Sequence, residues 1–352
     1  MKMKTLVLAM LPFGVSVAAF AQSTVTLYGV LDTGVTYTSN TSSGQTHGKD
    51  VALQSGVAMP ERWGITGKED LGGGNFAIFR LESQFQTSDG TLAFSDTAFG
   101  LQSYAGLGGN WGTLTLGRQY DFAGDILPAF AIAANTPAGL LAWSLPANAS
   151  AGGALDNRVW GIQVNNSAKY VSPTFSGFSF GTMWGFGNVP GSVARSSTQS
   201  YLLSYDNGKF SAALVYYGEH DVSSGGNVRV FAGGAGYNLG SFRFFGLVSD
   251  VSISSASSPR AVTYEAGLTY FVTPAIQLGG GFQYQDRNNG TGSANQATVT
   301  ADYLLSKRTD LYTVFALGHD RGYGAQVEAA PLGSNASGSM QSAFRVGLRH
   351  QF

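Results

Sequence analysis

The sequence has no cysteine and few charged residues. Among 352 residues, Asp, Glu, Lys and Arg together make up 12%. The lack of cysteine excludes disulfides, thiol catalysis and cysteine-ligated zinc or iron–sulfur sites. A soluble domain usually carries about 25% charge, so half that density indicates a surface that meets something other than water. Because 20 Lys and Arg stand against 21 Asp and Glu, a basic face for nucleic acid is also missing.

The amino-terminal segment has the pattern of an export signal. Lys2 and Lys4 precede an apolar run over residues 5–18, and Ala19-Phe20-Ala21 follows it. This pattern predicts a signal peptide over residues 1–21 and an exported domain over residues 22–352. The alternative, a membrane anchor, is disfavoured because the apolar run is shorter than the ~20 residues that a spanning helix needs.

Long uninterrupted apolar runs are absent from the rest of the chain. The most apolar long stretch, residues 126–155, is broken by Pro128, Pro137 and Pro146, which argues against a helical membrane protein. Apolar and polar residues instead alternate, which is typical of strands with one apolar and one polar face. In the first and last such segments the apolar parity comprises Val25, Leu27, Leu31, Val35, Tyr37, Phe344, Val346, Leu348 and Phe352.

These alternating segments predict an all-β protein, a transmembrane antiparallel β-barrel of 16 strands. Short connections alternate with longer Gly/Ser/Asn-rich ones, as in outer-membrane barrels. A soluble β-sandwich is the alternative, and the low charge and export signal disfavour it. We expect strands near residues 23–37, 57–69, 75–87, 98–107, 112–119, 158–171, 177–187, 197–205, 209–219, 228–237, 241–249, 260–271, 275–286, 295–305, 311–319 and 339–352.

The sequence contains no recognisable catalytic, metal-binding or phosphate-binding motif. The four histidines are scattered without metal-ligand spacing, and GQTHGK at residues 44–49 departs from the phosphate-binding loop in glycine spacing and in having Asp50 where Ser or Thr is needed. We therefore expect no cofactor, no metal and no enzymatic activity.

Charged residues on the polar parity of the early strands are the candidate functional residues. A charge facing lipid at the bilayer midplane costs about 2–4 kcal/mol, so these side chains should line the interior. The alternative is that each arginine is structural and pairs with Glu69, Glu82 or Asp121. The candidate pore arginines are Arg62, Arg80, Arg118 and Arg158.

The longest connection, residues 120–157, is too apolar for an exposed loop. It carries Phe130, Ile132, Leu140, Leu141, Trp143 and Leu145, and exposing them would create an unusual apolar patch. We predict that it folds into the barrel as a constriction loop. Asp125 on this loop and Glu82 on the wall would then face the arginines, which creates a transverse field across a narrow gap.

The sequence resembles the trimeric general porins of Gram-negative outer membranes, most closely the beta-proteobacterial and neisserial branch. The resemblance implies a 16-stranded barrel, a homotrimer and a third loop folded inward. The matching segments are VTLYGVLDTGV (25–35), ERWGITGKEDLGGG (61–74), GTLTLGRQYD (112–121), NNSAKYVSPTFSGFSF (165–180), LSKRTDLY (305–312) and FRVGLRHQF (344–352).

The resemblance also assigns several site residues. Arg62 matches a pore-wall arginine of the second strand, and Arg158 lies within one residue of another on the sixth. Gly117-Arg118 matches the strand that leads into the constriction loop, and residues 125–128 match the acidic segment of that loop.

This sequence departs from the family pattern in ways that concern selectivity. Leu101 stands where an arginine is usual, Ala129 where related loops carry glutamate, and Val30 where a lysine can occur. Arg80 stands where an uncharged residue is usual and is expected to compensate for Leu101.

The sequence therefore predicts a passive, water-filled outer-membrane channel for small hydrophilic solutes and ions, with weak anion preference. The expected partners are two further copies of the chain, outer-membrane lipid and lipopolysaccharide, and no nucleic acid. Two alternatives remain: a barrel hydrolase with a lipid-side Ser and His, and an adhesin or anchoring barrel with a plugged lumen.

Overall fold

The structure is a computed structural model that describes residues 23–43, 46–94, 96–142, 145–146, 155–222, 226–254, 258–287, 292–322, 325–327, 335–336 and 338–352. The predicted signal peptide and Trp143 lie outside these residues. The strands are β1 (Thr24–Ser43), β2 (Thr46–Ser55), β3 (Arg62–Gly72), β4 (Asn75–Gln84), β5 (Gln102–Gly109), β6 (Gly112–Tyr120), β7 (Leu145–Pro146), β8 (Gln163–Val171), β9 (Phe178–Gly185), β10 (Thr198–Asp206), β11 (Phe210–Val222), β12 (Gly226–Leu239), β13 (Phe242–Ser254), β14 (Arg260–Thr273), β15 (Ile276–Arg287), β16 (Gly292–Leu304), β17 (Thr309–Arg321), β18 (Ala325–Gln326), β19 (Asn335–Ala336) and β20 (Met340–Gln351).

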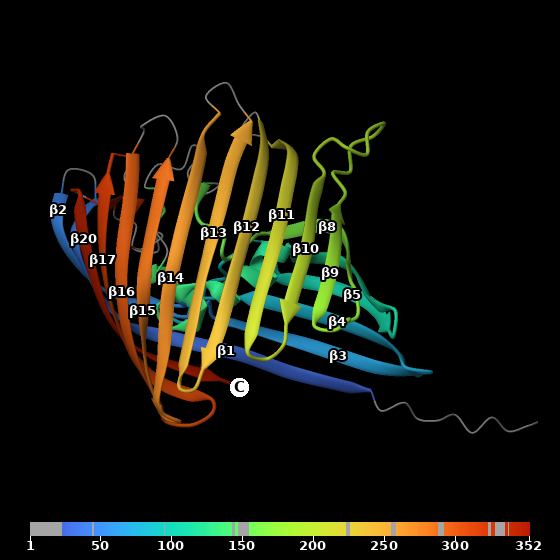
Figure 1. The fold of residues 1–352 in the computed structure, drawn as a ribbon, viewed down its shortest axis with the longest axis horizontal. Coiled ribbons are helices and arrows are strands. Elements are labelled where there is room, and N and C mark those ends of the chain that lie inside the picture. The colour runs from blue at the N-terminus through green and yellow to red at the C-terminus, as the bar shows by residue number, and fades with distance from the viewer. Residues whose placement is uncertain are drawn as a thin grey trace, which may run out of the picture.

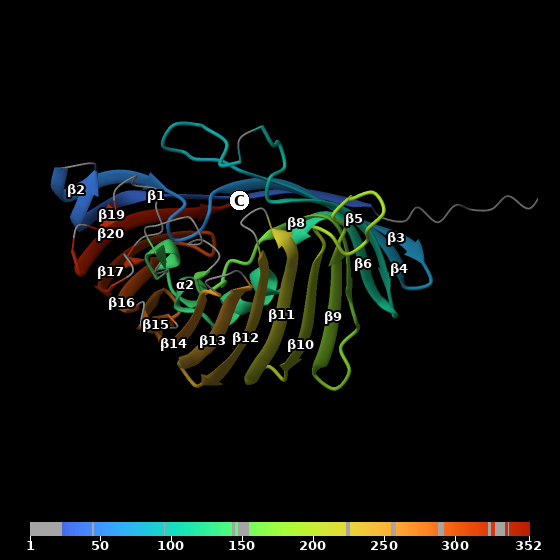
Figure 2. The same ribbon diagram turned by 90° about the horizontal axis from the view of Figure 1, so that it is seen from above.

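The strands form a closed antiparallel barrel (Figures 1 and 2). Neighbouring strands of the barrel pair with each other, whereas the short β7 and β18 pair in a separate two-stranded sheet. The last strand β20 returns to pair with β1, for example Thr33 opposite Leu348. β2 and β3 both pair with β1 and together form one interrupted barrel strand, which gives the predicted 16. Closure matters because every backbone group in lipid needs a hydrogen-bond partner, and a closed sheet has no free edge.

The predicted alternation of faces is confirmed. Val25 and Leu27 of β1 are 67% and 61% exposed on the outer face, whereas Asp32 and Thr36 of the same strand are fully buried. Similar rows of exposed apolar side chains continue around the wall, as the lipid-facing band of a barrel requires. None of the helices among the described residues is long and apolar enough to cross a membrane.

Some predicted strand boundaries are wrong. β1 continues to Ser43, and the second barrel strand begins at Thr46 instead of residue 57. It is interrupted at residues 56–61 because the Asp32 carboxylate accepts from the amides of Ala58 (2.5 Å) and Met59 (2.9 Å), which replaces ladder pairing there.

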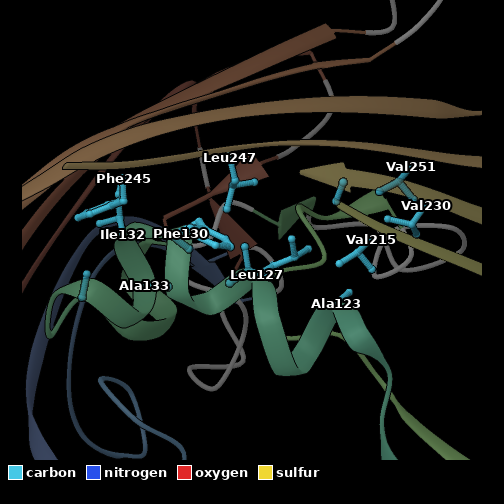
Figure 3. Packing of buried hydrophobic residues seen from close by; sticks show 14 of the residues in the cluster. Ala123, Leu127, Phe130, Ile132, Ala133, Val215, Val230, Phe245, Leu247 and Val251 are labelled. Carbon is cyan, nitrogen blue, oxygen red and sulfur yellow. The ribbon is translucent and has the colours of Figure 1, made fainter. Parts of the chain in front are cut away.

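The long connection between β6 and β8 lies inside the barrel, as predicted (Figure 2). It contains α1 (Phe122–Ile126), η1 (Leu127–Phe130), α2 (Ile132–Asn135) and η2 (Gly139–Ala142). Figure 3 shows its apolar side chains packed against the wall strands β11, β12 and β13. Each large side chain buried there contributes about 1.5–3 kcal/mol, so the wall and the loop share one apolar core. The labelled residues of that core are Ala123, Leu127, Phe130, Ile132, Ala133, Val215, Val230, Phe245, Leu247 and Val251.

Candidate functional site

The constriction loop is seated on glycines of the barrel wall. An ideal Cβ built on Gly181 of β9 would lie 2.3 Å from the Phe122 ring, and one on Gly234 of β12 would lie 2.5 Å from Phe130. A larger side chain at either position would push the loop away from the wall. The small residues therefore set how far the loop extends into the lumen.

Polar side chains from the neighbouring wall strands β13 and β14 also hold the loop. The Glu265 carboxylate on β14 accepts from the Ile132 amide and from Gln283 Nε2 (2.7 Å). The Thr269 hydroxyl donates to the Asn135 carbonyl at 2.7 Å. Arg243 on β13 donates to Asn135 Oδ1 (2.7 Å) and to the Ala129 carbonyl (2.9 Å). Ala129, where the expected glutamate is missing, is thus held through its backbone.

The 3-10 helix η2 of the loop docks into the break in the second barrel strand. The Leu140 amide donates to the Val57 carbonyl at 2.7 Å. Gly139 adopts φ 51°, and an ideal Cβ there would lie 1.9 Å from the Val57 oxygen, so the close approach requires glycine. The strand boundary missed by the sequence pattern is therefore a docking point for the constriction loop.

Arg62 and Glu82 form an ion pair on the lumen wall. Arg62 Nη1 lies 3.7 Å from Glu82 Oε1, with side chains 21% and 2% exposed. Tyr28 and Gln102 also donate to this carboxylate, at 3.0 and 3.2 Å. The structural alternative considered for the arginines, pairing with Glu82, holds for Arg62, which still keeps part of its surface in the lumen.

Arg80 lies beside this pair. It shares the inward parity of β4 with Glu82, and its guanidinium carbon lies 5.8 Å from the Tyr28 ring centre. Tyr104 lies within electrostatic range of Arg80, Glu82 and Asp125. Four of the six predicted site residues, Arg62, Arg80, Glu82 and Asp125, are therefore gathered around one part of the lumen.

Asp125 on the loop is paired with a cation that the sequence reasoning missed. Lys169 Nζ on β8 binds the Asp125 carboxylate and donates to the Tyr120 carbonyl at 2.8 Å. The Lys169 side chain is 7% exposed, whereas that of Asp125 is 39% exposed. The sequence pattern could have indicated this residue, because the alternation in NNSAKYV (165–171) places Lys169 on the polar face of the strand.

The expectation that Arg118 lines the interior is corrected. Its strand parity is that of Leu114 and Leu116, which are 39% and 57% exposed on the outer face. Arg118 Nε donates to the Gly100 carbonyl and Nη1 to Asn165 Oδ1, both at 2.7 Å. Arg118 therefore stabilises the barrel rim next to the β4–β5 connection.

The expected place of Arg158 on a strand is wrong, because β8 begins at Gln163. Arg158 lies in the preceding turn with φ 58°, is 6% exposed, and has its Nη2 3.8 Å from Asp121 Oδ2. Burial raises the pKa of Asp156 to about 6, although Arg158 opposes the shift, and burial also raises the pKa of Asp121. This buried cluster anchors both ends of the loop, which strand parity alone could not indicate.

Among the residues that the structure describes, no group of three or more His, Asp or Glu side chains is arranged to hold a metal ion.

Comparisons with known proteins agree with this geometry. The profile of a family described as Gram-negative porin matches residues 5–323. Outer membrane porin protein 32 of Delftia acidovorans is 30% identical over 99% of this chain and 100% of its own length. The major outer membrane protein P.IB of Neisseria meningitidis is 27% identical over the same shares.

Solved structures share the fold. A structure described as an anion-selective porin from Comamonas acidovorans matches with a TM-score of 0.78 and 27% identity, over 94% of this chain and 100% of that one. The trimer form of OmpT from Vibrio cholerae matches with a TM-score of 0.67 and 15% identity, over 94% and 99%. With its closed barrel and inward loop, the chain belongs to the Gram-negative porins, the channel-forming barrels of the outer membrane.

Proposed function

We propose that this porin is a passive diffusion channel for small hydrophilic solutes and ions with a weak preference for anions. The observation that carries the preference is the charge balance in the narrow part of the lumen. Arg62 is paired with Glu82, and Asp125 is paired with Lys169. Arg80 has no acidic partner within ion-pair distance among the described residues, so its positive charge is not cancelled there.

The position of this charge outweighs the net charge of the chain. Charges beyond about 8–10 Å are largely screened at physiological ionic strength, so a permeating ion responds to the groups at the constriction. Low-dielectric walls strengthen the field of such groups in a narrow passage. The preference is weak because the two ion pairs cancel most of the remaining local charge.

The similar porin from Comamonas acidovorans, described as anion-selective, supports the sign of this preference. In our proposal, the six site residues predicted from the sequence have different roles. Arg80 sets the sign, and Arg62, Glu82 and Asp125 shape the field. Arg118 and Arg158 act on the rim and the loop instead of on the ions.

Assembly as a homotrimer is part of the proposal. The outer face of strands β1, β3, β4, β5 and β6 has an apolar hollow of about 560 Å³, lined in part by Val25, Phe79, Leu107 and Leu116. A neighbouring copy would cover this face, whereas lipid and lipopolysaccharide would cover the rest of the apolar band. The trimer form of the similar OmpT fold supports this arrangement. Export by a cleaved signal over residues 1–21 completes the proposal.

We further propose that the channel has no catalytic activity. A barrel hydrolase needs a serine whose proton is taken by a histidine. Ser197 and His220 lie 3.3 Å apart, but the Ser197 hydroxyl donates to the Ala194 carbonyl at 2.7 Å and the residue is fully buried. His220 can therefore only donate to this oxygen. An esterase assay on the purified protein should give no turnover.

The experiment that tests the selectivity is a reversal-potential measurement in a KCl gradient across planar bilayers. The parent channel should favour chloride, and Arg80→Gln should remove most of that preference. Arg229→Gln, which replaces an exposed arginine on β12, is the matched control and should leave the potential unchanged. Cation preference in the parent channel would contradict the proposal.

A further inference from the structure

The Lys169 side chain is engaged on all sides. Its ammonium group binds the Asp125 carboxylate, donates to the Tyr120 carbonyl at 2.8 Å, and lies 4.6 Å from the Phe122 ring centre. An ammonium group has three N–H donors, so these contacts leave little for a passing solute. The side chain is only 7% exposed. Lys169 is therefore not itself a binding group for permeating anions.

Asp125 has the opposite exposure. Its side chain is 39% exposed, and it lines a hollow of about 280 Å³ together with Arg243 and Lys209. Without a bound cation, this carboxylate would present a full negative charge to ions beneath the loop. With Lys169 bound, the two charges form a short dipole whose field falls off much faster with distance.

We propose that Lys169 is a specificity-determining residue of this channel, because it neutralises the only acid of α1 in place. The inference rests on the proposed anion preference, which Arg80 can produce only if an unpaired Asp125 does not cancel its charge. The ion pair thus attaches the loop helix α1 to the wall strand β8 and also neutralises the charge of Asp125.

A purely structural role for Lys169 is the competing explanation. The loop has several other attachments that do not involve Lys169. Arg243, Glu265 and Thr269 bind residues 129–135, and the Leu140 amide donates to Val57 between β2 and β3. These should hold the loop when Lys169 is replaced. Loss of the lysine charge should therefore change selectivity more than it changes pore size.

The experiment compares reversal potential and single-channel conductance in four channels: the parent, Lys169→Met, Lys169→Arg, and the double variant Lys169→Met with Asp125→Asn. Lys169→Met should reduce the anion-to-cation permeability ratio about threefold, the effect of one unit charge ~6 Å from the ion path in partly screened water. Lys169→Arg should retain the parent ratio. The double variant, which removes both charges, should return close to it.

Two results would overturn the inference. In the first, Lys169→Met leaves the permeability ratio unchanged. In the second, the double variant keeps the full shift of Lys169→Met together with an altered conductance, which would mean that the loop has moved and that Asp125 was not unmasked. The permeability ratio and the conductance of each variant are both compared with those of the parent. The proposed function is tested separately, by the sign of the parent reversal potential and by the effect of Arg80→Gln. If Lys169→Met fails to fold, Lys169→Gln takes its place with the same expected decrease of about threefold, and an unchanged ratio in Lys169→Gln or a changed ratio in Lys169→Arg contradicts the inference.

Discussion

Arg345 on the last strand and Asp32 on the first form an ion pair of 3.4 Å, with both side chains fully buried at the seam that closes the barrel. Arg345 also donates to the Tyr312 hydroxyl (2.8 Å) and to Thr36 Oγ1 (2.9 Å), and Tyr312 donates to Asp32. Buried side chains of β1, β17 and β20 are thus joined to one another. They lie where β20 pairs with β1 and closes the barrel.

Replacing Arg345 by methionine should destabilise the barrel. Removal of one partner leaves the buried Asp32 carboxylate with its hydrogen bonds but without its opposite charge, and breaking a buried ion pair in this way typically costs about 3–5 kcal/mol. The temperature at which the folded band is lost in semi-native electrophoresis measures the effect. Arg229→Met at an exposed position should leave that temperature unchanged, and an equal loss in both variants would show that the seam is not special.

A large side chain at Gly181 should displace the constriction loop. A Cβ at this position already meets the Phe122 ring at 2.3 Å, so Gly181→Leu forces the ring and helix α1 toward the lumen. Single-channel conductance should change. Gly48→Leu is a matched control because an ideal Cβ on Gly48 has no atom within 4 Å. Unchanged conductance in Gly181→Leu would mean that the loop is not seated there.

Replacement of Arg118 should have little effect on ion selectivity. Its guanidinium is bound to Gly100 and Asn165 at the rim, away from the lumen side of β6. We expect Arg118→Gln to change the KCl reversal potential by much less than Arg80→Gln. An equal effect of the two substitutions would return Arg118 to the pore lining.

The loop anchor should give the protein a pH-dependent stability. Burial raises the folded-state pKa of Asp156 from 3.8 to about 6. The folded state therefore binds this proton more tightly than the unfolded chain, so the stability that Asp156 contributes decreases as pH rises from about 4 to about 6 and is constant above. The decrease is at most ~3 kcal/mol for a shift of about two pH units.

Thermal unfolding midpoints in detergent across this pH range measure the effect. Asp156→Asn cannot ionise, so its midpoint should decrease less between pH 4 and 6 than that of the parent. A smaller decrease remains expected because burial also raises the pKa of Asp121. The same pH profile in parent and variant would contradict the assignment to Asp156.

The sequence by itself determined the barrel and its inward loop. Period-two alternation, as in Val25 and Leu27 against Asp32 and Thr36, specifies which face meets lipid because successive side chains of a strand point to opposite sides. The apolar composition of residues 120–157 required burial, and burial inside the barrel followed. These are local properties, readable without knowledge of any contact.

Only the tertiary structure decided which charges act on the lumen. Arg158 and Arg118 are arginines in or beside expected strands, as pore residues would be. Arg158 nevertheless lies buried in a turn where its φ is positive, and the strand parity of Arg118 points it to the outer face at the rim. Lys169 meets Asp125 across 44 residues of sequence, and Arg345 meets Asp32 across 313. Pairing of charges depends on distances of a few ångströms between separate strands and loops. The sequence therefore specified the channel, whereas the folded chain left Arg80 without an acidic partner among the described residues, and we propose that this cation gives the channel its preference.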